Sequence, residues 1–252
     1  TIQTIGVVGA GAIGNEVIKN LTLLGVGTID IFDFDTIEVH NLTRSVLFRE
    51  SDIGRTKAET AAARARELDP NVALRAFEGD FWQRLSLARL ARYDALICCV
   101  DNVEARIRLN RLCHLVGTNL INCGIDSRFA LCTLYPFAEA HEPPCFECSL
   151  DDAGYAKAGE RYSCGGLRKV AFEERKVPTT VITSAQSAAM AVNFALQFTR
   201  DEPAQNETIS IFADTILGRT TRSRQRKRGG CGGCGQYPGR LKRIALSPIV
   251  AE

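Results

Sequence analysis

A glycine-rich turn near the start of the chain sets the fold class. Gly9-Ala-Gly-Ala-Ile-Gly14 lies between an apolar run, Thr4–Val8, and a segment with helical spacing, Ala12–Leu24. A strand, a glycine turn and a helix in this order begin a parallel βαβ unit. In such a turn the first glycine permits the bend, the second lets the backbone approach a phosphate, and the third lets the helix pack on the strand.

Strand-like and helix-like segments alternate up to about residue 125. The predicted strands are Thr28–Phe32, Val72–Phe77, Ala95–Val100 and Leu120–Cys123, and the predicted helices are Thr56–Leu68, Leu85–Ala91 and Glu104–Val116. Such alternation favours a parallel sheet with right-handed crossovers. The run Ala95–Val100 is apolar throughout, which is typical of a strand that is buried on both faces.

The pattern changes after residue 125. Phe129–Tyr135 is strand-like, residues 136–178 contain few periodic segments, and Thr183–Phe198 has the composition of a helix. Thr208–Ala213 and Thr220–Arg226 are predicted to form a final antiparallel pair. The expected fold class is α/β: a Rossmann-like, mostly parallel sheet flanked by helices, continued by antiparallel C-terminal strands and a four-cysteine zinc site.

The composition excludes several classes of partner. The 252-residue chain is 45% hydrophobic with a formal net charge of +2, so we expect neither nucleic acid nor an anionic membrane as its partner. No apolar run reaches the ~18 residues that a membrane span needs. No secretion signal is visible, and we expect a cytoplasmic protein. The basic run Arg222–Arg228 is interpreted as an exposed strand whose charges oppose edge pairing, with an acidic partner as the alternative.

Polar residues follow the predicted strands where a ligand would bind. Asp33-Phe-Asp35 comes directly after the second strand, and Asp33 lies 24 positions after Gly9. An acidic residue about 20 positions after the glycine turn holds the ribose of a bound nucleotide. In this strand–turn–helix context we expect nucleotide binding rather than a purely structural turn.

The remaining polar residues indicate which nucleotide. Arg44 can hold a phosphate with two parallel hydrogen bonds, and Lys57 supplies a compact positive charge. Asp101 follows a buried strand, and a carboxylate there suits Mg²⁺ bound to phosphates. These residues favour ATP and Mg²⁺. A nicotinamide oxidoreductase would explain the glycine turn but neither Arg44, Lys57 and Asp101 nor the cysteine pairs described below.

These residues carry a family resemblance. The segments GAGAIG, LLGVGTIDIFDFDTIEVHNLTRS, DIGRTKAE and CCVDN resemble the MoeB/ThiF/HesA-type adenylyltransferases, which are related to the adenylation domains of ubiquitin-activating enzymes. The likeness covers nearly the whole chain. There are two departures: Ala12 stands where many members have glycine, and Thr43 where the sulfur-carrier enzymes usually have glutamine.

The resemblance implies a role for each matching residue. It places Asp33 on the ribose hydroxyls, Asn41, Arg44 and Lys57 on the triphosphate, and Asp101 on Mg²⁺ and the α-phosphate region. The residues expected to bind nucleotide are Gly9, Gly11, Ala12, Gly14, Asp33, Asp35, Asn41, Arg44, Lys57, Asp101 and Asn102. The catalytic candidates are Arg44, Lys57, Asp101 and Cys164.

The resemblance also implies an activity. The chain would be one ThiF-type adenylation domain, with residues 1–125 as the nucleotide-binding half and 126–252 as the half that binds the acyl partner. It would form a homodimer and adenylate the C-terminal carboxylate of a ubiquitin-like or sulfur-carrier protein, with release of pyrophosphate. An enzyme that adenylates a ribosomal peptide in antibiotic biosynthesis is one alternative. A non-catalytic scaffold that binds a ubiquitin-like protein is another.

Two cysteine pairs predict a metal site. Cys145-Phe-Glu-Cys148 and Cys231-Gly-Gly-Cys234 each have CxxC spacing, and four thiolates suit a closed tetrahedral zinc site without an open position for catalysis. A pair of redox dithiols or disulfides is the alternative. The resembled family carries the same two pairs. We expect the metal to hold the C-terminal tail against the loop that follows the sheet.

The other cysteines divide into two groups. Five fall on predicted strands or a helix and are interpreted as buried small hydrophobic residues: Cys98, Cys99, Cys113, Cys123 and Cys132. Cys164 instead lies in the irregular stretch, between Arg161 and Arg168, which could favour its thiolate. Members of the resembled family that form a thioester carry their reactive cysteine on a loop in this region. Cys164 is therefore either that nucleophile or a neutral loop residue.

Overall fold

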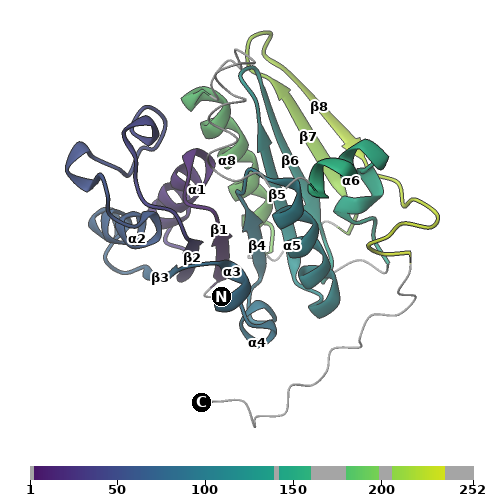
Figure 1. Cartoon of the computed structure of the whole chain (residues 1–252), viewed down its shortest axis with the longest axis horizontal. Helices are drawn as coiled ribbons and strands as arrows, with labels where there is room; N and C mark the ends of the chain where they lie inside the picture. Colours follow the sequence, from purple (N-terminus) through teal and green to yellow (C-terminus); the bar gives the residue numbers. More distant parts are fainter. Residues whose placement is uncertain (1–2, 139–141, 160–179, 199–205, 236–252) are drawn as a thin grey trace.

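The computed structural model describes residues 3–138, 142–159, 180–198 and 206–235. Within them, one eight-stranded sheet has the order β3-β2-β1-β4-β5-β6-β7-β8 (Figure 1). The strands are β1 (Thr4–Val8), β2 (Thr28–Asp33), β3 (Ala73–Glu78), β4 (Ala95–Cys98), β5 (Asn119–Ile125), β6 (Phe129–Tyr135), β7 (Ile209–Asp214) and β8 (Arg219–Arg224). The α-helices are α1 (Ala12–Leu23), α2 (Lys57–Leu68), α3 (Phe81–Arg84), α4 (Leu87–Leu90), α5 (Val103–Val116), α6 (Asp152–Gly159) and α8 (Val181–Leu196).

The sheet is parallel on one side and antiparallel on the other. Strands β1 to β5 pair in parallel, and β6, β7 and β8 continue the sheet with antiparallel pairing. The predicted fold class is confirmed. The chain proceeds from β1 to β2 and β3 on one side, and then crosses to β4 and β5 on the other. The carboxyl ends of β1 and β4 therefore border the point where open α/β sheets bind ligands.

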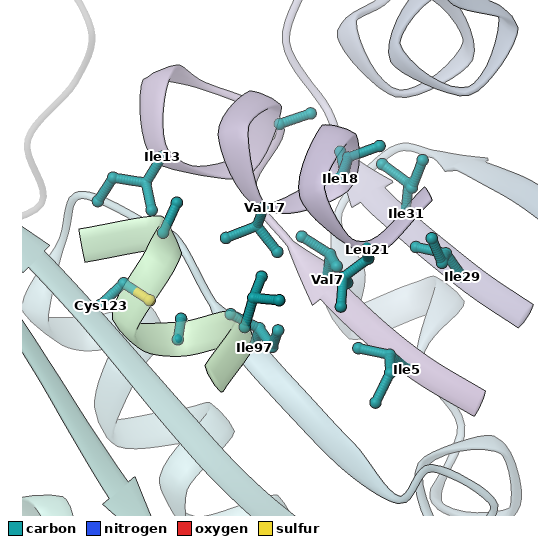
Figure 2. Packing of buried hydrophobic residues seen from close by; sticks show 14 of the residues in the cluster. Ile5, Val7, Ile13, Val17, Ile18, Leu21, Ile29, Ile31, Ile97 and Cys123 are labelled. Carbon is teal, nitrogen blue, oxygen red and sulfur yellow. The ribbon is translucent and has the colours of Figure 1, made fainter. Parts of the chain in front are cut away.

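Two hydrophobic clusters cover opposite faces of the sheet. On one face, α1, α2 and α8 cover the sheet, with α1 and α2 over the strands from β1 to β3 and α8 over β5 and β6. Figure 2 shows Val17 and Leu21 of α1 among Val7 of β1, Ile29 of β2 and Ile97 of β4, where each of these side chains is fully buried. On the other face, α5 packs over Val8, Phe32 and Leu96 together with the cysteine pairs. Burial on both faces explains why the parallel strands are apolar throughout.

Three segments differ from the sequence prediction. The expected helix Leu85–Ala91 is shortened to the single turn α4, which begins after its N-cap Ser86, and a turn that was not predicted, α3, begins after its N-cap Asp80. The expected irregular stretch contains α6 and a 3₁₀ turn, η3 (Phe146–Ser149). Strand β4 ends at Cys98 rather than Val100.

The last strand is an exposed edge. Every residue of β8 is exposed, and the Arg224 guanidinium pairs with Glu207 at 2.9 Å. The interpretation of the basic run as an exposed strand is confirmed for Arg222–Arg224, whereas residues 225–228 lie beyond β8, with Gln225 and Arg228 half-buried. Among the described helices, none combines the length and apolar character that a membrane crossing requires.

Candidate functional site

The glycine turn has the geometry that its sequence predicts. Gly9 has a φ of +95°, and a Cβ atom there would lie 2.8 Å from the carbonyl oxygen of Cys99. A Cβ atom on Gly14 would lie 1.9 Å from the carbonyl oxygen of Gly9, so the helix and the strand touch through backbone alone. A Cβ atom on Gly11 would meet nothing within 4 Å. The turn is therefore packed against backbone at Gly9 and Gly14 and open at Gly11.

The open side of the turn is the N-terminus of α1. Gly11 is the N-cap residue, Ala12 is the first helical residue, no side chain caps the helix, and its first turn contains no acidic residue. The first N–H groups of a helix lack partners within the helix and carry a partial positive charge. An uncapped helix end beside an open glycine turn suits an anion such as a phosphate.

Asp33 supports the same turn from the neighbouring strand. It is the last residue of β2, and its carboxylate accepts the N–H of Ala10 at 2.6 Å and that of Asp35 at 2.8 Å. Burial raises the pKa of the Asp33 carboxyl above its ordinary value, against the opposing effects of the Lys57 ammonium and the two N–H donors. An acidic group thus lies directly beside the glycine turn.

Lys57 reaches this place through the closure of a long loop. Residues 34–56 leave the sheet after β2, and backbone hydrogen bonds close the base of the loop: Ile37 donates to Arg55 at 2.8 Å and Lys57 to Asp35 at 2.9 Å. The Lys57 ammonium lies 2.7 Å from an Asp35 carboxylate oxygen. The Lys57 side chain is only 10% exposed, so its position is determined by the fold rather than by solvent.

Asn41 and Arg44 lie farther along this loop. Asn41 is buried, and its side-chain oxygen accepts the N–H of Glu38 at 2.8 Å. The Arg44 N–H donates to the Asn41 carbonyl at 3.2 Å. Arg44 is half-buried, and among the residues that the structure describes no hydrogen bond or ion pair involves its guanidinium. Arg44 is therefore a cation that is held by its backbone and available to a ligand.

Asn15 fastens this loop to the glycine turn, and the sequence analysis missed it. Its amide donates to the carbonyl of Ala10 at 2.6 Å and to that of Gly11 at 3.1 Å, and its oxygen accepts the N–H of Leu47 at 3.0 Å. Asn15 is fully buried. The available signal was an asparagine among the inward-facing positions of an apolar helix, where a polar group requires partners.

Asp52 orders the far part of the loop and was also missed. Its buried carboxylate pairs with Arg64 of α2 at 3.0 Å and accepts the N–H of Arg49 at 2.9 Å. Burial favours the neutral acid, but the Arg64 guanidinium and the Arg49 N–H outweigh it, and the pKa of Asp52 lies below its ordinary value. This ion pair connects the loop to α2.

Asp101 and Asn102 lie at the same edge of the sheet, after β4. Asp101 is exposed and three residues beyond the end of the strand, rather than directly after it. Asn102 is the N-cap of α5, and its side-chain oxygen accepts the N–H of Ala105 at 2.8 Å. The chain just before them contacts the glycine turn through Cys99. Asp101 is thus near the turn in the fold and open to a ligand.

The two cysteine pairs come together on the α5 side of the sheet. The sulfur atoms of Cys145, Cys148, Cys231 and Cys234 all lie within 4.8 Å of one another. Two of these contacts join Cys145 to Cys231 at 3.7 Å and Cys148 to Cys234 at 3.4 Å. Sulfur atoms around a tetrahedral zinc ion lie about 3.8 Å apart, given Zn–S bonds of about 2.3 Å. The four cysteines could therefore hold a metal ion.

A buried glutamate inside the first pair supports this cluster. Glu147 has no exposed surface. It accepts two hydrogen bonds from Arg111 of α5, at 2.9 and 2.7 Å, and one from the Tyr155 hydroxyl of α6 at 3.1 Å. A Cβ atom on Gly233 would lie 2.4 Å from the Glu147 carboxylate, so the second pair also closes around it. Spacing alone did not indicate this contact.

The remaining cysteines largely follow the prediction. Cys98, Cys113, Cys123 and Cys132 are buried. Cys99 is only half-buried because it lies where the chain leaves β4 beside the glycine turn. Cys164 lies outside the described residues.

Comparison with protein families gives one match across almost the whole chain. The family model described as the ThiF family matches residues 2–233. SUMO-activating enzyme subunit 2 of Dictyostelium discoideum is 37% identical over 150 residues, which are 58% of this chain and 22% of that protein. Adenylyltransferase and sulfurtransferase MOCS3 of Sus scrofa is 27% identical over 233 residues, which are 92% of this chain and 48% of that protein. The chain thus spans half or less of the length of these relatives.

Solved structures show the same fold. The E. coli MccB structure with MccA-N7isoASN has a TM-score of 0.73 and 23% identity, with coverage of 92% of this chain and 67% of that chain. The structure titled as the Microcin C7 biosynthetic enzyme MccB in complex with N-formylated MccA has a TM-score of 0.71, 23% identity and the same coverage.

Proposed function

The chain belongs to the ThiF family, and on that premise we propose that it adenylates the C-terminal carboxylate of a ubiquitin-like or sulfur-carrier protein with ATP. The relatives are named as a SUMO-activating enzyme subunit, an adenylyltransferase and sulfurtransferase, and a ubiquitin-like modifier-activating enzyme. The structural observation that carries the proposal is the open turn at Gly11, with the cation Arg44 on the loop that folds beside it and Lys57 at the start of α2, where that loop ends.

Each residue of the turn region has a proposed role toward ATP. Backbone N–H groups from Gly11 to Ile13 bind phosphate at the helix end, and Gly9 and Gly14 keep that end close to the strand. The Asp33 carboxylate accepts the ribose hydroxyls beside Ala10. Asp35 keeps the Lys57 ammonium in place.

The loop and the edge after β4 complete the proposed ATP site. Asn41, Arg44 and Lys57 contact the triphosphate. Asp101 and Asn102 border the α-phosphate region, and the exposed Asp101 carboxylate suits Mg²⁺, which takes one or two carboxylates together with phosphate oxygens. Bound Mg²⁺ would neutralise phosphate charge and favour the departure of pyrophosphate.

The proposed reaction is a displacement at the α-phosphorus. An oxygen of the partner's C-terminal carboxylate forms a bond to the α-phosphorus while the bond to the bridging oxygen breaks, and pyrophosphate leaves with that electron pair. The carboxylate is already ionised near neutral pH, so no general base is required. The protein contributes positioning and positive charge, chiefly from Arg44 and Lys57.

The four cysteines are proposed to hold Zn²⁺ as a structural ion, because their sulfur spacing fits a tetrahedral site without an open position. Cytoplasmic location and reduced thiolates are part of this proposal. The further proposals rest on the family: residues 1–252 as one adenylation domain, a homodimer, and Cys164 as the residue that receives the acyl group as a thioester.

ATP–pyrophosphate exchange tests the proposed activity. With a candidate carrier protein that ends in a free carboxylate, the wild-type chain is expected to exchange labelled pyrophosphate into ATP. Asp101→Ala is expected to abolish this exchange. Glu207→Ala is the control and is expected to keep it, because Glu207 pairs with Arg224 of the edge strand β8. Exchange that Asp101→Ala leaves unaffected, or that needs no carboxylate partner, would contradict the assignment.

Peptide adenylation is the second candidate. The fold that this chain shares with the Microcin C7 biosynthetic enzyme MccB supports it. Replacing the carrier protein by short peptides in the exchange assay separates the two. A chain that binds a ubiquitin-like protein but catalyses no ATP–pyrophosphate exchange would be a scaffold. Binding of NADH, measured by its fluorescence, would instead indicate an oxidoreductase.

A further inference from the structure

Arg106 of α5 has no role in the site proposed above, yet it joins the chain that follows β4 to strand β5. Its guanidinium donates to the carbonyl oxygen of Val100, to that of Cys123 and to the side-chain oxygen of Asn122. Val100 precedes Asp101 and follows β4, whereas Asn122 and Cys123 belong to β5. One side chain of α5 therefore connects the chain after β4 to the neighbouring strand.

The sheet geometry explains why a cation is needed here. The parallel pairing of β4 with β5 ends at Cys98 and Asn122, and beyond it β5 continues to Ile125 while the other chain turns toward α5. Beyond this point the two chains no longer exchange sheet hydrogen bonds, so the carbonyl groups of Val100 and Cys123 receive no N–H from the neighbouring chain. Buried backbone carbonyls require a donor, and the forked guanidinium of Arg106 supplies several at fixed angles.

The same segment is held from its other side. A Cβ atom on Gly9 would lie 2.8 Å from the Cys99 carbonyl oxygen, and one on Gly14 would lie 3.7 Å from the Cys99 Cβ. The chain from Cys99 to Asp101 is thus confined between the glycine turn and Arg106. Asp101 itself is exposed, so these backbone contacts, rather than packing of its side chain, determine where its carboxylate lies.

We propose that Arg106 is a positioning residue for adenylation, which fixes the Val100–Asn102 segment so that the Asp101 carboxylate faces the α-phosphate and Mg²⁺ in one orientation. This proposal rests on the adenylation function proposed above. Arg44 is on a different loop and Lys57 begins α2, so neither depends on Arg106. Loss of Arg106 is therefore expected to lower the rate of the chemical step and to raise the Mg²⁺ requirement, with little effect on the KM for ATP.

The test compares Arg106→Met with Arg108→Met. Arg108 is on the same helix, but its guanidinium pairs with Glu104 of that helix and lies 4.3 Å from the centre of the Trp82 ring. Hydrogen exchange followed by mass spectrometry reports opening of residues 99–102 without any substrate. Pyrophosphate exchange reports kcat, the KM for ATP and the Mg²⁺ dependence per folded molecule.

Arg106→Met is expected to lose amide protection at residues 99–102 and about 10- to 100-fold in kcat, and Arg108→Met to match the wild type. Arg106→Lys, which keeps a cation but not the fork, is expected to be intermediate, and it replaces the Met variant should that variant not fold. Unchanged protection and unchanged kcat in Arg106→Met would overturn the proposal, as would a loss confined to the melting temperature. A wild type without exchange activity would instead refute the adenylation function, and the protection measurement would still decide whether Arg106 holds the segment.

Discussion

Arg111 on α5 holds Glu147, the residue inside the first cysteine pair, through two hydrogen bonds of 2.9 and 2.7 Å. The Glu147 carboxylate is fully buried, while the Arg111 side chain is about half exposed. The helix whose first turn borders the proposed ATP site is thus joined to the proposed metal site by a charged pair. Neither residue is a ligand candidate in the cluster, so the pair acts on the fold around the metal.

Glu147→Gln is expected to destabilise the protein by about 1–3 kcal/mol, because the charged hydrogen bonds to Arg111 are weakened in a buried place. It is also expected to speed zinc release to a chelator, since the first cysteine pair is less firmly held. Glu142→Gln is the matched control: Glu142 pairs with Lys227 at 3.0 Å with 55% of its side chain exposed, and its loss is expected to cost under about 1 kcal/mol. Urea unfolding measures both, and equal effects of the two substitutions would contradict the role of Glu147.

Two glycine substitutions separate folding from nucleotide binding. Gly14→Ala would bring a Cβ atom to 1.9 Å from the Gly9 carbonyl oxygen, and we expect a loss of about 1–3 kcal/mol or more in stability even without ATP. Gly11→Ala meets open space, so the fold is expected to keep its stability within about 0.5 kcal/mol. The added methyl group occupies the face where phosphate would bind, and the affinity for ATP should fall. Thermal melting and calorimetric titration measure the two effects; an unchanged ATP affinity in Gly11→Ala would place the phosphates elsewhere.

The Arg128–Asp214 pair predicts a pH dependence of stability. Two hydrogen bonds from Arg128 lower the pKa of Asp214 from 3.8 to about 2. Because the pKa is lower in the folded state, the pair stabilises the protein fully above about pH 3.8, and this stabilisation is lost as the pH falls toward 2. The difference in unfolding free energy between the wild type and Asp214→Asn should therefore be constant from neutral pH to about pH 5 and shrink in stronger acid. Both proteins carry the same cysteine cluster, so the difference isolates the Asp214 carboxylate, which also accepts the N–H groups of Ile216 and Leu217; a difference that grows in acid would show the opposite sign of linkage.

Metal removal tests the cysteine cluster directly. Native mass spectrometry is expected to find one zinc ion per chain, and Cys231→Ser to lose it. A chelator should lower the melting temperature by roughly 10 °C. This shift corresponds to a loss of about 2.5–5 kcal/mol in unfolding free energy, because about 1 kcal/mol corresponds to 2–4 °C in a domain of this size. Cys113→Ser, a buried cysteine of α5 outside the cluster, is the control and should keep its zinc. A wild type purified under reducing conditions without bound metal would exclude the zinc assignment.

The sequence alone determined the features that depend on neighbouring residues or on periodicity. The alternation of apolar strands with helices predicted the parallel sheet, and the tight sterics at Gly9 and Gly14 follow directly from the glycine spacing. The cysteine spacing predicted the cluster because two CxxC pairs have few ways to bring four sulfur atoms to one ion. Local signals also have limits: the expected helix Leu85–Ala91 is only the single turn α4, and the turn α3 that Asp80 caps was not predicted.

Only the tertiary structure decided which distant polar groups satisfy one another. Asn15 meets Leu47, Arg106 meets Cys123, and Arg111 meets Glu147, across separations in the chain that no short pattern spans. Each pair exists because burial removes water, so a polar group must find its partner within the protein. That requirement acts on the folded chain as a whole. It explains why the sequence predicted the groups that are proposed to contact ATP and zinc, whereas the side chains that hold those groups in place became visible only in the fold.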